Sequence, residues 1–138
     1  MKRKRQWVRV PPKPAKQKVS PEFMRMVDKA VTTCIETTLK PRYFSEKPFD
    51  EARRLVNIYA KWHQQHFVHF LAEFHDTRPN VIQEHYSDPF ARMAYMGDER
   101  FNLAYMRHTG QWWDKYQNIP LKDCLDAIKN DDFFMIHV

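Results

Sequence analysis

Apolar residues recur at helical spacing near the start of the chain. The stripe consists of Phe23, Met26, Val27, Ala30, Val31, Cys34, Ile35 and Thr38. Ser20 can cap a helix, Pro21 suits the first helical position, and Glu22 complements the positive end of the helix dipole. The pattern therefore predicts a core-facing helix from Ser20 to about Leu39, ending before Pro41 because proline disfavours helical backbone in the residue ahead of it.

Residues 51–75 show two apolar periodicities, and they predict different structures. One set would form the stripe of a long helix: Ala52, Leu55, Val56, Tyr59, Phe67, Phe70, Leu71 and Phe74. Two other sets alternate as strands do: Val56, Ile58, Ala60 and Trp62, then Val68, Phe70, Ala72 and Phe74. The β-branched and aromatic content favours a hairpin that turns at residues 63–66, although this turn lacks Gly, Asn or Pro. The long helix stays open as the alternative.

Three alternating, aromatic-rich runs lie between residues 90 and 116. They are separated by residues 97–99 and 109–110, which contain Gly97 and Gly110, the only glycines of the chain. Glycine at each turn predicts an antiparallel meander. One face would carry Ala91, Met93, Tyr95, Phe101, Leu103 and Tyr105, and the other would show Arg92 and Ala94 beside Asn102 and Ala104. Residues 111–116 would add a fifth strand.

The predicted fold class is α+β: an N-terminal helix, a five-stranded antiparallel meander sheet, a short C-terminal helix and an extended basic N-terminal arm. Residues 76–88 would be a loop, and the closing helix would start at Asn118 or Pro120. The expected core cluster contains Val31, Ile35, Leu103, Tyr105 and Leu125, and the aromatics Phe133 and Phe134 would dock on the body. Residues 20–138 would form one domain, with the first helix covering one sheet face.

Basic residues are concentrated at the N-terminus. Eight of the 23 Lys and Arg residues lie in residues 1–21, where no acid occurs, so the other 15 face all 17 acidic residues in the body. Residues 1–19 also contain three prolines, which block regular pairing, and their like charges repel. They would form an extended or disordered arm. The body, being nearly neutral, would not bind nucleic acid by charge alone.

The two cysteines, Cys34 and Cys124, lie on apolar stripes of predicted helices. They are expected to be buried, reduced and structural, which indicates a reducing cytosol. No apolar run approaches the length of a membrane span, so no membrane partner is expected.

Three segments carry a resemblance to known sequences: PFARMAYMGDERFNLAYMRHTGQWWDKY, LKDCLDAIKND and the opening MKRKRQWV with its PPKP. Together they resemble a family of small uncharacterised bacterial proteins, and YMRHTGQWW is the most specific part. The resemblance covers nearly the whole chain and implies a bacterial cytosolic origin and a single domain. It implies no activity, cofactor, partner or functional residue.

The densest polar and aromatic cluster contains Arg107, His108, Trp112 and Trp113. These are candidate contacts for a ligand or partner. Arg107 and His108 would point to opposite faces of a strand, and so would the two tryptophans. Arg107 could grip a phosphate or carboxylate, but a structural ion pair at the sheet edge is the favoured reading.

Metal and catalytic signatures are weak. His63, His66 and His69 would line one helix face, but on a hairpin His66 and His69 face opposite sides. Neither a Gly-x-Ser-x-Gly elbow nor a glycine-rich phosphate loop occurs. We therefore expect no metal, no cofactor and no enzymatic activity, with a small enzyme around Arg107 and His108 as the least favoured alternative.

The leading functional hypothesis is a non-enzymatic accessory protein that binds RNA or a ribonucleoprotein through its arm. The candidate residues are Lys2, Arg3, Lys4, Arg5, Trp7, Arg9, Lys13, Lys16 and Lys18. Rings of the body, Trp62, Phe67, Trp112 and Trp113, could stack on bases, although no RRM-type motif occurs. The alternative is a protein–protein interaction module that uses exposed aromatics of the sheet.

Overall fold

The computed structural model describes residues 19–138, and the predictions for residues 1–18 lie outside this range. The elements in chain order are α1 (Pro21–Cys34), η1 (Ile35–Leu39), α2 (Lys40–Phe44), β1 (Arg53–His63), β2 (Phe67–Asp76), β3 (His85–Gly97), β4 (Arg100–Met106), β5 (Trp112–Pro120), α3 (Leu121–Asn130) and η2 (Asp132–Phe134). Among these residues, none of the helices has the length and hydropathy that crossing a membrane requires.

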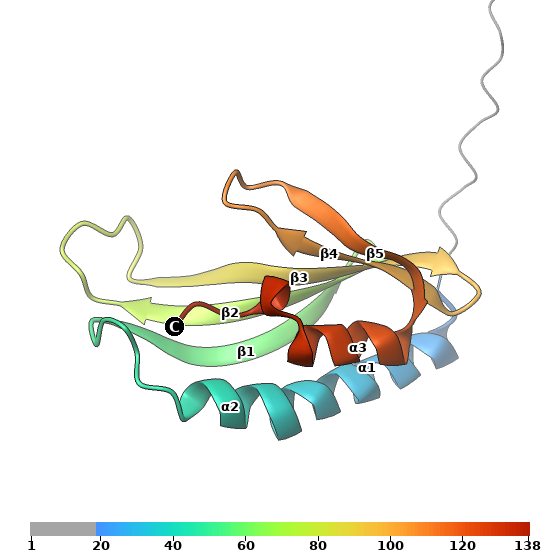
Figure 1. The fold of residues 1–138 in the computed structure, drawn as a ribbon, viewed down its shortest axis with the longest axis horizontal. Coiled ribbons are helices and arrows are strands. Elements are labelled where there is room, and N and C mark those ends of the chain that lie inside the picture. The colour runs from blue at the N-terminus through green and yellow to red at the C-terminus, as the bar shows by residue number, and fades with distance from the viewer. Residues whose placement is uncertain (1–18) are drawn as a thin grey trace, which may run out of the picture.

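The five strands form one antiparallel sheet in which spatial order follows chain order, from β1 to β5. Figure 1 shows α1, α2 and α3 on the same side of this sheet, with the opposite side left open. The predicted α+β class, with an N-terminal helix, a five-stranded meander and a short C-terminal helix, is confirmed.

Residues 51–75 form the hairpin rather than the long helix. β1 and β2 pair from Arg53 opposite Asp76 to His63 opposite Phe67. The turn places Gln64 and Gln65 at φ values of 54° and 53°, in the left-handed region that glycine or asparagine usually occupies. The turn was therefore hard to recognise from its residue types, and the alternation of the flanking strands was the better signal.

The core lies between the covered sheet face and the helices. Four of the five predicted core residues, Val31, Ile35, Leu103 and Leu125, are buried, and the fifth, Tyr105, is partly buried against the same cluster. Met93 pairs with Leu103, and both are fully buried. The predicted strand parity is therefore correct, since a shift by one residue would have exposed Leu103.

The sequence predicted that the first helix would end before Pro41, and this prediction is wrong. Helical backbone continues to Phe44 through the π-helical turn η1, in which the Lys40 N–H bonds to the Ile35 carbonyl. Pro41 then occupies the first turn of α2, directly after the π-helical turn. The wider π turn lets the chain pass a proline without stopping.

β3 begins at His85, several residues before the predicted strand. Pro89 lies inside it, opposite Leu71, directly beside an irregularity in the β2–β3 register. Proline cannot donate to a ladder and is tolerated at bulges, which explains why it does not end the strand. A second irregularity, between Leu55 and Asn57, leaves Val56 45% exposed while Leu55 packs against the core.

Both cysteines are buried and free, as predicted. Burial raises the pKa of Cys34 and raises the pKa of Cys124 to about 12. Neither thiol is therefore activated as a nucleophile, because the reactive thiolate is disfavoured in apolar surroundings. Of the two aromatics at the C-terminal end, Phe134 docks as predicted and is fully buried, whereas Phe133 is 55% exposed.

Candidate functional site

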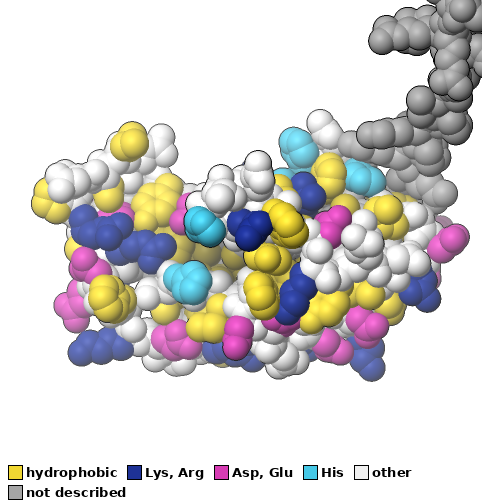
Figure 2. Space-filling model, turned by 45° about the horizontal axis from the view of Figure 1, so that its top comes forward, with side chains coloured by type: hydrophobic (Ala, Val, Ile, Leu, Met, Phe, Trp, Pro, Cys, Tyr) yellow, Lys and Arg dark blue, Asp and Glu magenta, His cyan; other side chains and the backbone are white. Residues whose placement is uncertain are grey.

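A row of paired residues crosses all five strands on the open face of the sheet, and all of them except Ala104 are polar. Lys61 pairs with His69, His69 with Arg92, Arg92 with Ala104, and Ala104 with Asp114. Figure 2 shows histidine, Lys/Arg and hydrophobic side chains lying side by side at the upper right of this exposed side. Cations and rings therefore lie together on this face. The open-face patch consists of Lys61, His63, Phe67, His69, Arg92 and Trp112.

Arg92 is the centre of the open-face patch. Its guanidinium lies 4.7 Å from the centroid of the Phe67 ring and 5.1 Å from that of the Trp112 ring. Within residues 19–138, its buried Nε has no hydrogen-bond partner, and the guanidinium is in no ion pair. Burial lowers the pKa of Arg92, but an arginine keeps its charge at neutral pH. The charge of Asp114 acts on Arg92, but the two side chains form no ion pair, so this cation between two rings is suited to receive an anion.

The pKa of His69, which lies beside Arg92, indicates a positive local electrostatic potential. The pKa of His69 is lowered first by burial and then by the charges of His63, Arg92 and Lys61. The His63 and His69 rings lie 5.6 Å apart, and the His69 ring lies 5.7 Å from Trp112. Among the described residues, the only group placed to hold a metal ion involves other histidines. The patch therefore offers positive charge and rings.

The structure divides the predicted contact residues between two faces. Trp112 lies against His69 and Arg92, whereas Trp113 is 50% exposed and carries the Arg107 guanidinium 4.4 Å from its ring centroid. Arg107 thus stacks on a ring and has no ion pair among the described residues, so the favoured structural ion pair is absent there. His108 is exposed in the β4–β5 turn. Within the part of the chain that the structure describes, no ion pair joins Arg107 or His108 to an acid.

The chain enters the described body at the same end of the sheet as the open-face patch. Val19 is buried in the core, and the Phe23 ring lies 5.6 Å from the Tyr95 ring. The Tyr95 N–H bonds to the His66 carbonyl at 2.9 Å, in the turn that precedes Phe67. The eight predicted arm cations precede this point in the sequence, outside the described residues.

The sequence did not single out Arg92 or His69 as site residues. Arg92 was placed correctly on the solvent face of the meander, and Phe67 was recognised as a possible stacking ring. Their proximity depends on the β2–β3 register, in which Phe67 lies opposite Ala94 and His69 opposite Arg92. The alternation of apolar and polar residues along β2 and β3 could have indicated the site. It puts Phe67, His69 and Arg92 on one face of the sheet once the pairing of the two strands is known.

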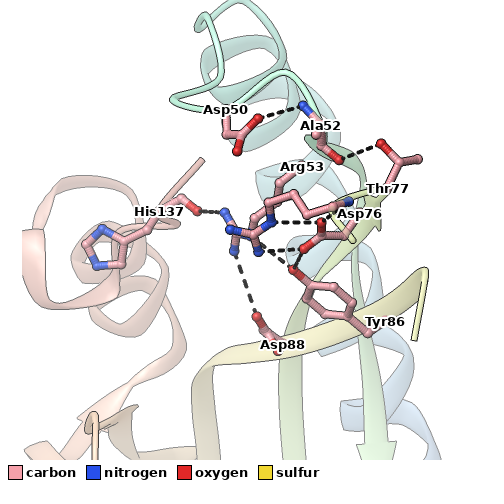
Figure 3. Close-up of polar contacts among 9 residues, drawn as sticks. Asp50, Ala52, Arg53, Asp76, Thr77, Tyr86, Asp88 and His137 are labelled. Atoms are coloured by element: carbon pink, nitrogen blue, oxygen red, sulfur yellow. Dashed lines mark hydrogen bonds and ion pairs between the residues drawn. The ribbon is translucent and has the colours of Figure 1, made fainter. Parts of the chain in front are cut away.

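A second polar cluster lies at the opposite end of β2, around the fully buried Asp76 (Figure 3). Arg78 donates to both carboxylate oxygens of Asp76, from Nε at 2.9 Å and Nη2 at 2.6 Å, and the Tyr86 hydroxyl donates at 2.9 Å. Arg53 donates to the Tyr86 oxygen at 3.0 Å and to the His137 carbonyl at 2.8 Å. The cluster joins β1, β2, β3 and the C-terminal segment, and its carboxylate is fully engaged, so it stabilises the fold.

Asp76 predicts an acid-dependent loss of stability. The Arg78 hydrogen bonds hold the pKa of this carboxyl well below its usual range. Because the pKa is lower in the folded state, the stabilisation is complete above the unfolded value of about 4 and is lost as the pH falls below it. We expect Asp76→Asn to be less stable than the wild type at pH 7. Its free energy of unfolding in urea should also fall less than that of the wild type between pH 7 and pH 3. Asp98→Asn, in an exposed turn, is the control, and equal pH profiles for Asp76→Asn and wild type would contradict the assignment.

Comparison with known proteins gives one match. The model of a family described as a domain of unknown function (DUF3024) matches residues 20–136. No curated protein and no solved structure matches the chain. The match begins at the N-cap of α1 and covers the sheet and α3.

Proposed function

The chain belongs to the DUF3024 family of domains of unknown function, and we propose that it binds single-stranded RNA, free or in a ribonucleoprotein. In this proposal the open-face patch stacks on bases and holds phosphate, and the basic arm adds charge. The protein acts as a non-enzymatic accessory factor. The proposed compartment is a reducing bacterial cytosol, which the two buried free thiols favour.

The observation that carries the proposal is the state of Arg92. Among residues 19–138 the buried Nε of Arg92 has no partner, so the guanidinium is not engaged by a carboxylate or carbonyl at that atom, at a cost in free energy. A phosphate would bind the guanidinium, because its planar donor geometry matches that of phosphate oxygens. The flanking rings of Phe67 and Trp112 fix its position.

The surrounding residues favour a nucleic acid over a small anion. Lys61 extends the positive charge beyond Arg92, and the charges of His63, Arg92 and Lys61 all act to lower the pKa of His69. Sequence-tolerant binding of single strands combines such a charged surface with aromatic rings on which bases stack. The arm cations precede Val19 in the sequence, and Val19 is buried in the core at the same end of the sheet.

Two matched pairs of variants test the proposal. Trp112→Ala should weaken binding of mixed-sequence single-stranded RNA by about 5- to 150-fold, the loss of one stacking contact of about 1–3 kcal/mol. Trp113→Ala, which removes the neighbouring ring on the other face, should change affinity little. Arg92→Ala should make the log–log salt dependence shallower by about 0.7, whereas Arg25→Ala, which removes an exposed charge from α1, should not.

Fluorescence anisotropy of labelled RNA at several salt concentrations measures all five proteins. Equal losses for Trp112→Ala and Trp113→Ala would exclude the open-face patch as the contact surface. Absence of binding by the wild type would reject the proposal and favour the protein–protein alternative, for which the 50% exposed Trp113 under Arg107 is the specific observation.

A further inference from the structure

Two histidines and a glutamate converge where the β2–β3 loop meets the sheet. His75 lies directly opposite His85 in the antiparallel pair, and their rings stack with centroids 4.4 Å apart and an interplanar angle of 6°. Glu84 precedes His85 and accepts a hydrogen bond from His75 Nε2 at 2.7 Å. One ligand atom from each of the three residues lies within 4.8 Å of the others.

We propose that His75, Glu84 and His85 bind a divalent transition-metal ion. Two imidazole nitrogens and one carboxylate oxygen form a donor set that zinc uses in proteins, with a remaining position for water. Bonds of about 2.0–2.2 Å in tetrahedral geometry place neighbouring ligand atoms about 3.3 Å apart. The three donors, now within 4.8 Å of one another, therefore need to close by at most about 1.5 Å, which rotation of partly exposed side chains allows.

The backbone beneath the donors is already fixed. The Asp76 N–H bonds to the Glu84 carbonyl at 2.7 Å, next to the His75–His85 pair. Asp76 is held in turn by Arg78 and Tyr86, so the two ends of the loop keep their positions. Binding thus requires only side-chain adjustment, and the entropy of ordering a loop does not have to be offset.

The existing hydrogen bond marks the position of the ion. A proton between His75 Nε2 and Glu84 Oε1 now joins two atoms that would both become ligands. When a metal ion takes this place, the Nε2 proton moves to Nδ1 of a neutral His75 or leaves a protonated His75 for solvent, and the neutral imidazole and the carboxylate remain as donors. Binding of Mg²⁺ and Ca²⁺ is disfavoured, since these ions take oxygen ligands and only one carboxylate is present.

This site is separate from the open-face patch. His75 follows His69 by six residues along β2, which corresponds to about 20 Å of strand. Neither Arg92 nor Trp112 contributes to it, and the inference does not depend on RNA binding.

Isothermal titration calorimetry of the untagged, EDTA-treated full-length protein with ZnSO₄ tests the inference. The wild type should bind about one equivalent of Zn²⁺ at this site. His85→Ala, which removes a direct ligand, should weaken binding by more than the about 10- to 100-fold typical of losing an outer partner. Glu84→Gln should weaken binding by at least about tenfold, and Zn²⁺ should raise the melting temperature of the wild type by more than that of this variant. His108→Ala, which removes an exposed histidine elsewhere, is the control and should bind as the wild type does.

The outcomes separate clearly. Loss of one Zn²⁺ equivalent in His85→Ala and Glu84→Gln, with His108→Ala unchanged and all circular dichroism spectra alike, supports the site. Wild-type affinity in both ligand variants, or no saturable Zn²⁺ binding by the wild type, overturns it. Binding of Ca²⁺ as tight as that of Zn²⁺ would overturn the assigned ion class.

Discussion

Replacing Phe101 with alanine is expected to lower the free energy of unfolding by about 3–5 kcal/mol. Phe101 is fully buried at the start of β4. Its ring lies 6.0 Å from that of Phe23 on α1 and 5.5 Å from that of Tyr95 on β3. Truncation removes the apolar surface that joins the helix layer to the sheet and leaves a cavity that the neighbouring rings cannot fill without moving.

Urea unfolding monitored by tryptophan fluorescence and circular dichroism measures this loss. Val56→Ala is the matched control, because it also shortens an apolar strand residue but at a site that is 45% exposed. The midpoint should fall strongly for Phe101→Ala and little for Val56→Ala, with similar slopes. A loss of less than about 1 kcal/mol for Phe101→Ala would mean that the packing between α1 and the sheet contributes little to stability.

Deleting residues 1–18 is expected to weaken RNA binding by about 300-fold at 0.15 M salt. If about four of the eight arm cations contact phosphate at once, counterion release gives a log–log salt slope near −3, and this slope corresponds to about 2.5 decades of affinity between 1 M and 0.15 M salt. The deletion should stop before Val19, since that side chain is buried in the core. The truncated protein should therefore keep its fold.

Anisotropy titrations at two salt concentrations, with the full-length and truncated proteins, provide the measurement. A full-length variant whose eight arm cations are replaced by glutamine separates charge from chain length, and Trp7→Ala tests stacking by the arm, worth up to about 1–3 kcal/mol. Equal affinity of the full-length and truncated proteins would remove the arm from the proposed function and leave the open-face patch alone.

The sheet could be predicted because its signals are local. Gly97 and Gly110 adopt φ values of 92° and 82°, and their positions between alternating runs marked the turns. Alternation then fixed which side of each strand is apolar, so Leu103 and Arg92 were assigned to opposite faces correctly. The face that contains Leu103 had to be the covered one, because the opposite assignment would have buried Arg92 beside Asn102.

The candidate sites could not be predicted because they depend on pairing between strands. Arg92 meets Phe67 and Trp112 only after the four strands β2 to β5 are aligned, and the β2–β3 register contains an irregularity that alternation alone does not show. His75 and His85 are ten residues apart and lie directly opposite each other only because of the loop length and that register. The π-helical turn before Pro41 likewise reflects packing that overrides a local stop signal.

The order of the strands has a kinetic consequence. Every pairing in the sheet joins strands that are consecutive in the chain, so the longest segment closed by any one pairing is the loop between β2 and β3. Closing short segments costs little chain entropy, and each hairpin can form beside the one already made. The pairings that join distant parts of the sequence are those of the helices and C-terminal segment with the sheet. We therefore expect a nucleus in the central hairpins, with docking of α1 and of the C-terminal residues later in folding.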